Sequence, residues 1–461
     1  MPSEKAIIGL IMLTTFILAA FCIHSGHDWG DDFALYIQQA QAIQHHSLHQ
    51  LYTQNKFLLD HSDAVISPYL YPNGFPLLLS GLMIFTGMNL MAMKWMCALF
   101  FIASIPITYS LFKNKFESKN YSLLIVCAIA LQGVMLSLTD NVISDLPFFF
   151  FCMSGLLMME KSKRLYSRIL LGFIIFFAYS IRDTGIFLLV ALFVYDAQQY
   201  FTHKYPKASI TILLSSYFGF LSFYWLNNIF FFHSSANLFS LFKPVNSAVI
   251  TTSFNYYSGI IANYFFIPII AFYLRWPLMA CIVSGAIINV KKDAFLMVFM
   301  VLSFSIYLIW PTTQGIRYIL PVIPLCIYYF AVFVYWLSNI RTPRYYNLIL
   351  IVLVSSMALR GIKFVYSYSK QDTNEAKTAE MDKMYNYIST SVPADKIICF
   401  FKPRALRLFT GRNGIVVGDS LLMKSPADYL LQKGLASNNK ESLKMVYNTD
   451  NYFLYQIVRS K

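Results

Sequence analysis

Charged residues are scarce in this sequence, and their scarcity excludes a soluble globular protein. Only 13% of the 461 residues are Asp, Glu, Lys or Arg, whereas 57% are hydrophobic. A soluble domain needs roughly 25% charged residues to cover its surface. The apolar residues also form continuous blocks, without the alternating segments of about ten residues that build a membrane β-barrel. The composition therefore predicts a polytopic α-helical membrane protein.

Motifs of several enzyme classes are missing as well. The sequence has no Walker phosphate-binding loop, no glycine-rich dinucleotide fingerprint and no G-x-S-x-G nucleophile elbow. None of the seven cysteines belongs to a C-x-x-C pair, and all but Cys399 lie inside apolar blocks. We therefore interpret the cysteines as small packing residues within the membrane and predict no disulfides.

Histidines crowd the stretch after the first apolar block, but the pattern of a zinc site is incomplete. His45 and His49 stand four residues apart, and neither a cysteine nor an H-E-x-x-H sequence accompanies them. A wet interfacial helix is the better interpretation. We therefore predict no cofactor, although the sequence leaves a divalent metal open.

The net charge of +14 includes five basic clusters that predict the topology. The positive-inside rule puts all five on the cytoplasmic side, so the charge indicates orientation in the membrane and no nucleic-acid partner. The first apolar block, residues 6–23, is interpreted as an uncleaved first helix, with a cleaved signal peptide as the alternative. The clusters are Lys113/Lys115/Lys119, Lys161/Lys163/Arg164/Arg168, Lys204/Lys207, Lys291/Lys292 and Arg341/Arg344.

Two spans must separate each successive pair of clusters, which predicts about eleven spans. The N-terminus then lies inside and the C-terminus outside the cytoplasmic (inner) membrane. Two further apolar segments, residues 71–87 and 259–274, would invert the middle of the protein if each crossed the membrane. We therefore expect both to be re-entrant or juxtamembrane helices on the outer face.

The last hundred residues change character and predict a second domain. They are more charged than the rest of the chain and are broken by proline and glycine. We expect a helix at about 375–389, a strand-like run at 396–401, a helix opened by Ser425 and Pro426, and a hairpin over 443–458. Residues 361–461 would form a small extracytoplasmic (periplasmic) α/β domain, after a membrane domain of residues 1–360 with an outer loop at 25–90.

Two adjacent carboxylates, Asp31 and Asp32, follow the first apolar block. Adjacent acids at a membrane surface repel each other, so they are usually either solvated or arranged as a base or a metal ligand. Either aspartate would also cap the helix that follows. Both interpretations stay open, and one aspartate can be the helix cap while the other is the base or the metal ligand.

A second acidic stretch, with Asp140 and Asp145, lies between two predicted spans on the outer side. Asp145 stands directly before the apolar run 146–151. An ionisable group at the edge of the membrane is a functional candidate, but Asp-Leu-Pro also begins a helix well. The sequence does not separate these two interpretations.

Arginines occupy two further positions on the outer side. Arg317, followed by Tyr318, stands at the outer end of a span, where the positive-inside rule disfavours it. A guanidinium there suits phosphate, with snorkelling to lipid headgroups as the alternative. Arg182 and Asp183 are predicted to form a structural pair.

Taken together, these positions resemble the GT-C membrane glycosyltransferases that use polyprenyl-phosphate sugars. The likeness is to the bacterial branch related to protein mannosyltransferases and lipid A aminoarabinose transferases. Residues 403–412 also resemble the small outer domain of that family. In the first motif, many members of the family have Asp-Glu where this chain has Asp31-Asp32. The stretch 233–258 has no acid, which disfavours a metal-dependent enzyme with a diphosphate donor. The matching motifs are Asp31-Asp32-Phe33-Ala34-Leu35-Tyr36, Tyr71-Pro72-Asn73-Gly74-Phe75-Pro76-Leu77-Leu78, Ser144-Asp145-Leu146-Pro147 and the Gly-x-Arg-Tyr-x-x-Pro-x-x-Pro element at 315–324.

The resemblance implies an inverting transferase that moves a sugar from a polyprenyl-phosphate donor to an envelope acceptor, which is a lipid, a glycan or a protein. It implies that Asp31 is the base and that Asp32 or Asp145 orients the sugar or the acceptor. A transporter or flippase is the alternative, disfavoured because the paired charges lie at the outer face and not in mid-span. A weaker alternative is an accessory membrane subunit whose outer domain only binds a partner. The implied binding residues are Arg317, Tyr318, Arg182, Tyr71 and Asp140.

Overall fold

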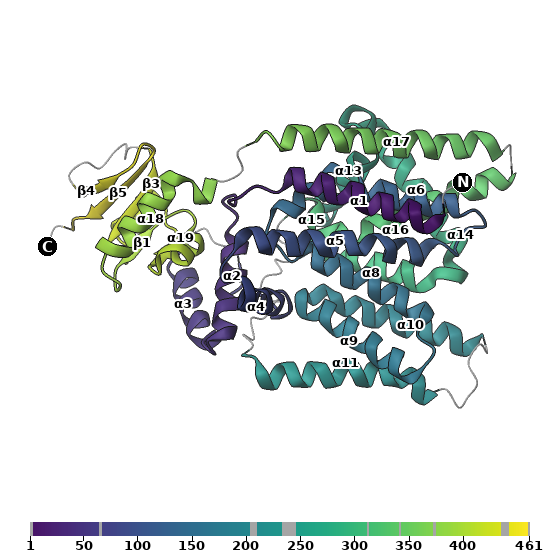
Figure 1. The fold of residues 1–461 in the computed structure, drawn as a ribbon, viewed down its shortest axis with the longest axis horizontal. Helices are drawn as coiled ribbons and strands as arrows, with labels where there is room; N and C mark the ends of the chain where they lie inside the picture. Colours follow the sequence, from purple (N-terminus) through teal and green to yellow (C-terminus); the bar gives the residue numbers. More distant parts are fainter. Residues whose placement is uncertain are drawn as a thin grey trace.

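The computed structural model describes residues 3–63, 67–202, 210–232, 246–310, 313–340, 343–371, 375–434 and 442–459. These residues form a long bundle of helices with a small sheet at one end (Figure 1). The N-terminus lies toward the opposite end of the bundle (Figure 1). The predicted basic cluster Lys204/Lys207 and Arg341 fall outside the described residues.

Helices make up the bundle and the region between the bundle and the sheet. In chain order they are α1 (Glu4–Cys22), α2 (Asp31–Gln44), α3 (Leu48–Asp60), α4 (Gly74–Thr86), α5 (Leu90–Phe112), α6 (Lys119–Ala130), α7 (Gly133–Ser137), η1 (Leu138–Asp140), α8 (Asp145–Lys161), α9 (Leu165–Ile181), η2 (Asp183–Ile186), α10 (Phe187–Phe201), α11 (Ile210–Phe230), α13 (Ser247–Phe265), α14 (Pro268–Leu308), α15 (Ile316–Ile319), η4 (Leu320–Val322), α16 (Ile323–Ile340) and α17 (Pro343–Tyr368).

The predicted count of about eleven spans is wrong. Among the described residues, seven helical segments are long and apolar enough to cross a membrane, or eight if the bent pair of α6 and α7–η1 is one span. Two of the expected crossings, α8 and α9, are only 17 residues long. Both helices are therefore at the lower limit of the roughly 17–25 residues of a transmembrane helix. The chain is nevertheless a multi-pass membrane protein.

The long helix α14 also lowers the count, because it contains two expected spans in one continuous segment. At 41 residues it is about 60 Å long, roughly twice the thickness of the hydrocarbon core. Asp293 interrupts it with non-helical dihedral angles (φ −129°, ψ 34°). The segment is therefore two helices joined by a kink, next to the basic pair Lys291/Lys292.

Several basic clusters meet at one end of the bundle, as the charge pattern predicts. Lys119 forms an ion pair with Glu4 near the N-terminus. Lys115 pairs with Glu160, which neighbours the second cluster, and with Asp293, which neighbours a third. This end lies opposite the C-terminal sheet (Figure 1). Which membrane side it faces stays a prediction.

The two extra apolar segments have different outcomes. Residues 71–87 yield α4, whose 13 residues are shorter than a span, as expected for a juxtamembrane helix. The expected single helix at 259–274 is wrong, because this stretch contains the end of α13 and the start of α14. Phe266 is extended (φ −124°, ψ 163°), and Pro268, which lacks an amide hydrogen, opens the next helix.

The C-terminal region is a mixed sheet with helices. Its strand order is β2-β1-β3-β5-β4, with β1 parallel to β2 and β3, and β5 antiparallel to β3 and β4. The predicted hairpin is confirmed as β4–β5. The elements are η5 (Glu375–Lys377), α18 (Ala379–Ser391), β1 (Ile397–Cys399), α19 (Pro403–Thr410), β2 (Asn413–Ile415), α20 (Asp419–Leu422), β3 (Tyr429–Lys433), β4 (Leu443–Asn448) and β5 (Tyr452–Ile457).

The helix predicted after Pro426 is wrong, because the chain forms β3 there. This strand pairs with β1 on one side and with β5 on the other. Pairing on both edges fixes an extended backbone, and this long-range effect outweighs the local helix-opening signal of Ser425 and Pro426.

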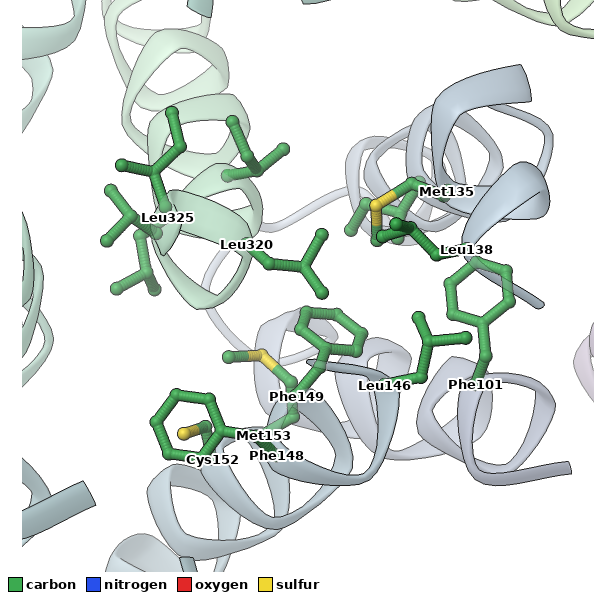
Figure 2. Close-up of a cluster of buried hydrophobic side chains, with 14 of the residues drawn as sticks. Phe101, Met135, Leu138, Leu146, Phe148, Phe149, Cys152, Met153, Leu320 and Leu325 are labelled. Carbon is green, nitrogen blue, oxygen red and sulfur yellow. The ribbon is translucent and has the colours of Figure 1, made fainter. Parts of the chain in front are cut away.

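A cluster of buried apolar side chains joins the first turns of α8 and α16 to α5 (Figure 2). Leu146 directly follows Asp145, and Leu320 lies three residues after Arg317. Both leucines are fully buried in the same cluster as Phe101 of α5. Packing of these neighbours therefore fixes where Asp145 and Arg317 lie.

Candidate active site

The adjacent acids Asp31 and Asp32 begin α2 and meet different partners. Gly30 occupies the N-cap position, so the predicted side-chain cap is wrong for both aspartates. Successive helical residues point about 100° apart. Asp32 contacts Arg317, whereas Asp31 lies 4.0 Å from Arg404 Nε of the C-terminal region. The helix thus directs one carboxylate toward the bundle and the other toward the sheet domain.

Asp145, in the first turn of α8, is fully buried and pairs with two arginines. Its Oδ2 lies 2.8 Å from Arg182 Nη2 and 3.3 Å from Arg317 Nε. Its Oδ1 is buried and has no hydrogen-bond partner among the described residues. Two guanidinium groups therefore balance the charge of this buried carboxylate through one of its two oxygens.

Arg317 connects the two acids. Its Nη2 donates to Asp32 Oδ2 at 3.2 Å, its Nε to Asp145 Oδ2, and its Nη1 to Gln314 Oε1 at 3.4 Å. Snorkelling to lipid headgroups does not fit these contacts. The following residue, Tyr318, stacks on Tyr307 with a centroid distance of 4.6 Å. Arg317 is therefore held by protein acids at the bundle end near the sheet domain.

Arg182 pairs with Asp145, so the predicted pair with Asp183 is wrong. The backbone of Arg182 is extended between α9 and η2 (φ −148°, ψ 133°), which points its side chain away from its neighbour in sequence. Its Nε donates to Ser144 Oγ at 3.0 Å, and Ser144 Oγ lies 3.0 Å from Tyr36 Oη. These contacts extend the network from α8 to α2.

Tyr71 completes the network from the loop before α4. Its hydroxyl donates to Asp32 Oδ1 at 2.7 Å, and its ring stacks on Tyr36 with a centroid distance of 4.3 Å. Gln39 holds the Tyr71 backbone from both sides, donating to its carbonyl at 2.7 Å and accepting from its amide at 3.0 Å. The predicted residues Asp32, Asp145, Arg182, Arg317 and Tyr71 thus form one connected group.

The two adjacent acids differ in pKa. Burial raises the pKa of Asp31, and the positive charges of Arg404 and Lys402 oppose it only in part. Burial acts in the same direction on Asp32, but Arg317 and the Tyr71 hydrogen bond outweigh it and lower the pKa. Asp31 Oδ1 is also buried without a hydrogen-bond partner among the described residues. Of the two, Asp31 is the better proton acceptor.

Asp140 lies in a different group of contacts from that of Asp145. Its carboxylate accepts from Lys94 Nζ at 2.7 Å and from Tyr368 Oη at 3.2 Å, and it lies 2.8 Å from His24 Nδ1. We did not single out Lys94 from the sequence, although a lysine inside an apolar block was an available signal. The fully buried ammonium of Lys94 explains why a carboxylate is needed here.

A second pair of arginines, Arg404 and Arg407 of α19, was missed as a site feature. Arg404 Nη2 donates to Pro68 O at 2.9 Å, and Arg407 Nη2 donates to Gln38 Oε1 at 2.8 Å. Both side chains are buried. Their spacing of three residues on an amphipathic helix was the available signal, because it puts both on one face.

Among the residues that the structure describes, no group of three or more His, Cys, Asp or Glu side chains is arranged to hold a metal ion.

Comparisons with known proteins bear on this geometry. No family model and no curated protein matches the chain. Several solved structures do match the chain. ArnT from Cupriavidus metallidurans bound to undecaprenyl phosphate aligns with a TM-score of 0.59 at 10% identity and covers 98% of both chains. The oligosaccharyltransferase of Archaeoglobus fulgidus, tethered with an acceptor peptide, aligns with a TM-score of 0.56 at 11% identity over 93% of this chain and 69% of that one.

A third structure, the arabinofuranosyltransferase AftD from Mycobacteria, aligns over 100% of this chain and 42% of its own, with a TM-score of 0.59 at 10% identity. All three are GT-C glycosyltransferases. The chain has the GT-C fold. The resemblance drawn from the motifs is therefore confirmed at the level of the GT-C fold, while the roles of individual residues rest on the contacts described above.

Proposed function

We propose that the chain is an inverting glycosyltransferase that transfers a sugar from a polyprenyl-phosphate donor to an envelope acceptor. The observation that carries this proposal is the convergence of Arg182 and Arg317 on Asp145 and Asp32, next to a third acid with a raised pKa. The GT-C fold supports it, because solved proteins of that fold bind undecaprenyl phosphate and dolichol-phosphate.

The donor phosphate is assigned to the two arginines. When the sugar–phosphate bond breaks, the leaving polyprenyl phosphate gains negative charge, and fixed cations at that position lower the barrier. Each guanidinium has five N–H donors. Arg317 makes hydrogen bonds through all three nitrogens. Arg182 makes them through Nε and Nη1, the latter to the Arg317 carbonyl at 3.5 Å, and its Nη2 forms the ion pair with Asp145. N–H groups on the Nη atoms remain for phosphate oxygens.

The acceptor proton is assigned to Asp31. An acceptor hydroxyl gives its proton to the Asp31 carboxylate while its oxygen attacks the anomeric carbon, and the bond from that carbon to the phosphate oxygen breaks. The electron pair leaves with the polyprenyl phosphate, so a single in-line displacement inverts the configuration. Asp145 is fully buried, so it acts on the donor through the two arginines that it holds in place. Asp32 positions Arg317 through its ion pair.

We place this site and the C-terminal domain on the outer side of the cytoplasmic membrane. The support is the meeting of basic clusters at the other end of the bundle. Exposed cysteines introduced by Asn114→Cys and Ser420→Cys should react with a membrane-impermeant maleimide from opposite sides. Labelling from the same side would contradict the orientation.

The test of the function is donor cleavage by the purified protein in lipid vesicles. With a polyprenyl-phosphate sugar, wild type should release free polyprenyl phosphate and transfer the sugar to acceptor. Asp31→Asn should lower the rate by about 10²–10⁴-fold, the usual contribution of a positioned base. Asp395→Asn is the matched control, because Asp395 is an exposed residue of the C-terminal domain with an ion pair to Lys396. Translocation of uncleaved donor by wild type would favour a flippase instead.

A further inference from the structure

A polar groove of about 250 Å³ lies between α2, α3 and α19. Hydrogen-bonding side chains dominate its lining, and the apolar contribution comes only from Ala42, Leu51 and Leu408. Its main polar residues are Gln38, Gln41, His45, Gln50, Gln54 and Arg407.

Arg407 brings a positive charge into the polar groove that no carboxylate neutralises at close range. Its side chain is 8% exposed, and its guanidinium donates to the neutral oxygens of Gln38 and Asn55. Among the described residues, it forms no salt bridge. Burial and the neighbouring Arg404 lower the pKa of Arg407 to about 10, so the group is still charged at neutral pH. A buried charge without an opposite charge nearby is costly in free energy, and an anion bound in the groove would lower that cost.

The polar groove and Asp31 are connected through α2 and Arg404. Gln38 lies seven residues after Asp31, which is about two helical turns and 10 Å on the same face. Gln38 donates to the carbonyl of Arg404 at 2.7 Å, and Arg404 Nε lies 4.0 Å from Asp31. The polar groove therefore begins about two helical turns from the proposed base.

We propose that the polar groove binds an anionic, hydroxyl-rich saccharide, which is the acceptor of the transfer reaction. The role as acceptor site rests on the proposed function. Glutamine amides both donate and accept hydrogen bonds, as sugar hydroxyls do, so a row of glutamines matches a row of hydroxyls. Arg407 supplies the contact for a carboxylate or phosphate on the saccharide. An acidic peptide would need apolar pockets for its other side chains, and the groove has few.

Binding of defined probes to the full-length protein in nanodiscs, without donor, tests the inference. Isothermal titration should give tighter binding for a trimer of galacturonic acid than for the neutral maltotriose, by roughly tenfold or more. Gln54→Glu puts a negative charge into the groove while it keeps side-chain size and helix propensity. It should weaken binding of the charged trimer by roughly tenfold and leave maltotriose unaffected. The matched control is Gln456→Glu, the same change at an exposed position of β5.

Equal affinity for the two trimers, or an unchanged affinity of the charged trimer for Gln54→Glu, would overturn the inference. Tighter binding of tri-aspartate than of the charged trimer would also overturn it and point to an acidic peptide. The release of polyprenyl phosphate is measured separately. If wild type cleaves donor but binds neither trimer, the proposed function stands and the groove is not a saccharide-binding site. If wild type binds the charged trimer but does not cleave donor, the groove is a saccharide-binding site and the proposed transferase function is wrong.

Discussion

Two arginine pairs flank α2, and they differ in how their charge is balanced. On the bundle side, Arg182 and Arg317 both contact Asp145, and Arg317 also contacts Asp32. On the side of the C-terminal domain, the one carboxylate near Arg404 among the described residues is Asp31, at 4.0 Å, and Arg407 donates to neutral oxygens. Two cations therefore contact two acids on one side, whereas on the other side one cation lies near a single acid and the other forms no ion pair among the described residues.

This difference separates the tasks of Asp31 and Asp32, which stand next to each other in sequence. Asp32 is held by a guanidinium and a phenol, and its pKa is lowered. Asp31 keeps a buried oxygen without a partner among the described residues, and burial raises its pKa. A carboxylate already bound by donors is a good anchor and a poor base, so the bundle side suits the donor and the other side the acceptor.

The largest effect is expected for Asp145→Asn. This change should abolish transfer and also destabilise the protein by about 3 kcal/mol, the low end of the cost of breaking a buried ion pair, because the partly buried Arg182 and Arg317 lose the carboxylate that they share. Asp31→Asn should lower the transfer rate by about 10²–10⁴-fold with little loss of stability, since the nearest cation is 4.0 Å away. Thermal unfolding of both variants in detergent, next to the donor-cleavage rate, checks this. Equal unfolding temperatures for the two variants would contradict the difference in charge balance.

The next largest effect is expected for Arg317. Alanine removes both ion pairs and the proposed phosphate contact, so Arg317→Ala should lose about 10²–10³-fold in transfer rate. Lysine keeps the charge but not the fork that reaches Asp32 and Asp145 together, so Arg317→Lys should retain part of the activity. The measurement is the donor-dependent rate at matched protein levels. Full activity in Arg317→Ala would remove this residue from the site and leave Arg182 as the phosphate ligand.

What could be predicted from the sequence were features that depend on nearby residues. The acids at the start of α2, the tyrosine before α4 and the β4–β5 hairpin follow from local patterns, and the structure contains them. The ordered motifs were also sufficient for the GT-C fold, at an identity to solved structures of only 10–11%.

What could not be predicted were pairings between distant segments. Arg182 was assigned to its neighbour Asp183, but it pairs with Asp145 because its backbone is extended. The span count failed because helix length depends on where the folded chain turns: α8 and α9 are only 17 residues long, and two expected spans form the single kinked segment α14. Arg407 contacts Gln38 across 369 positions of the chain, and no local pattern carries that information.

A smaller effect is expected in the pH dependence of transfer. A base works when it is ionised, so transfer is lost as the pH falls through the pKa of Asp31. Because burial raises that pKa, the acid limb of kcat/KM should lie above the ordinary aspartate value of about 3.9. Lys402 holds the pKa down, so Lys402→Gln should move the limb to higher pH without changing the rate at its plateau. The control Lys444→Gln, at an exposed site, should leave the limb in place.

The smallest effect is expected for Tyr71→Phe, which tests whether Asp32 only positions other groups. The change keeps the ring on Tyr36 but removes the hydroxyl that donates to Asp32 Oδ1 at 2.7 Å. Asp32 still has Arg317, so kcat/KM should fall several-fold and by no more than about tenfold, or 1.4 kcal/mol. Tyr69→Phe is the matched control, because Tyr69 stands two residues earlier and packs edge-on against Tyr52 instead. A loss as large as that of Asp31→Asn would mean that Asp32 and Tyr71 handle the acceptor proton, and the division of tasks across α2 would then be reversed.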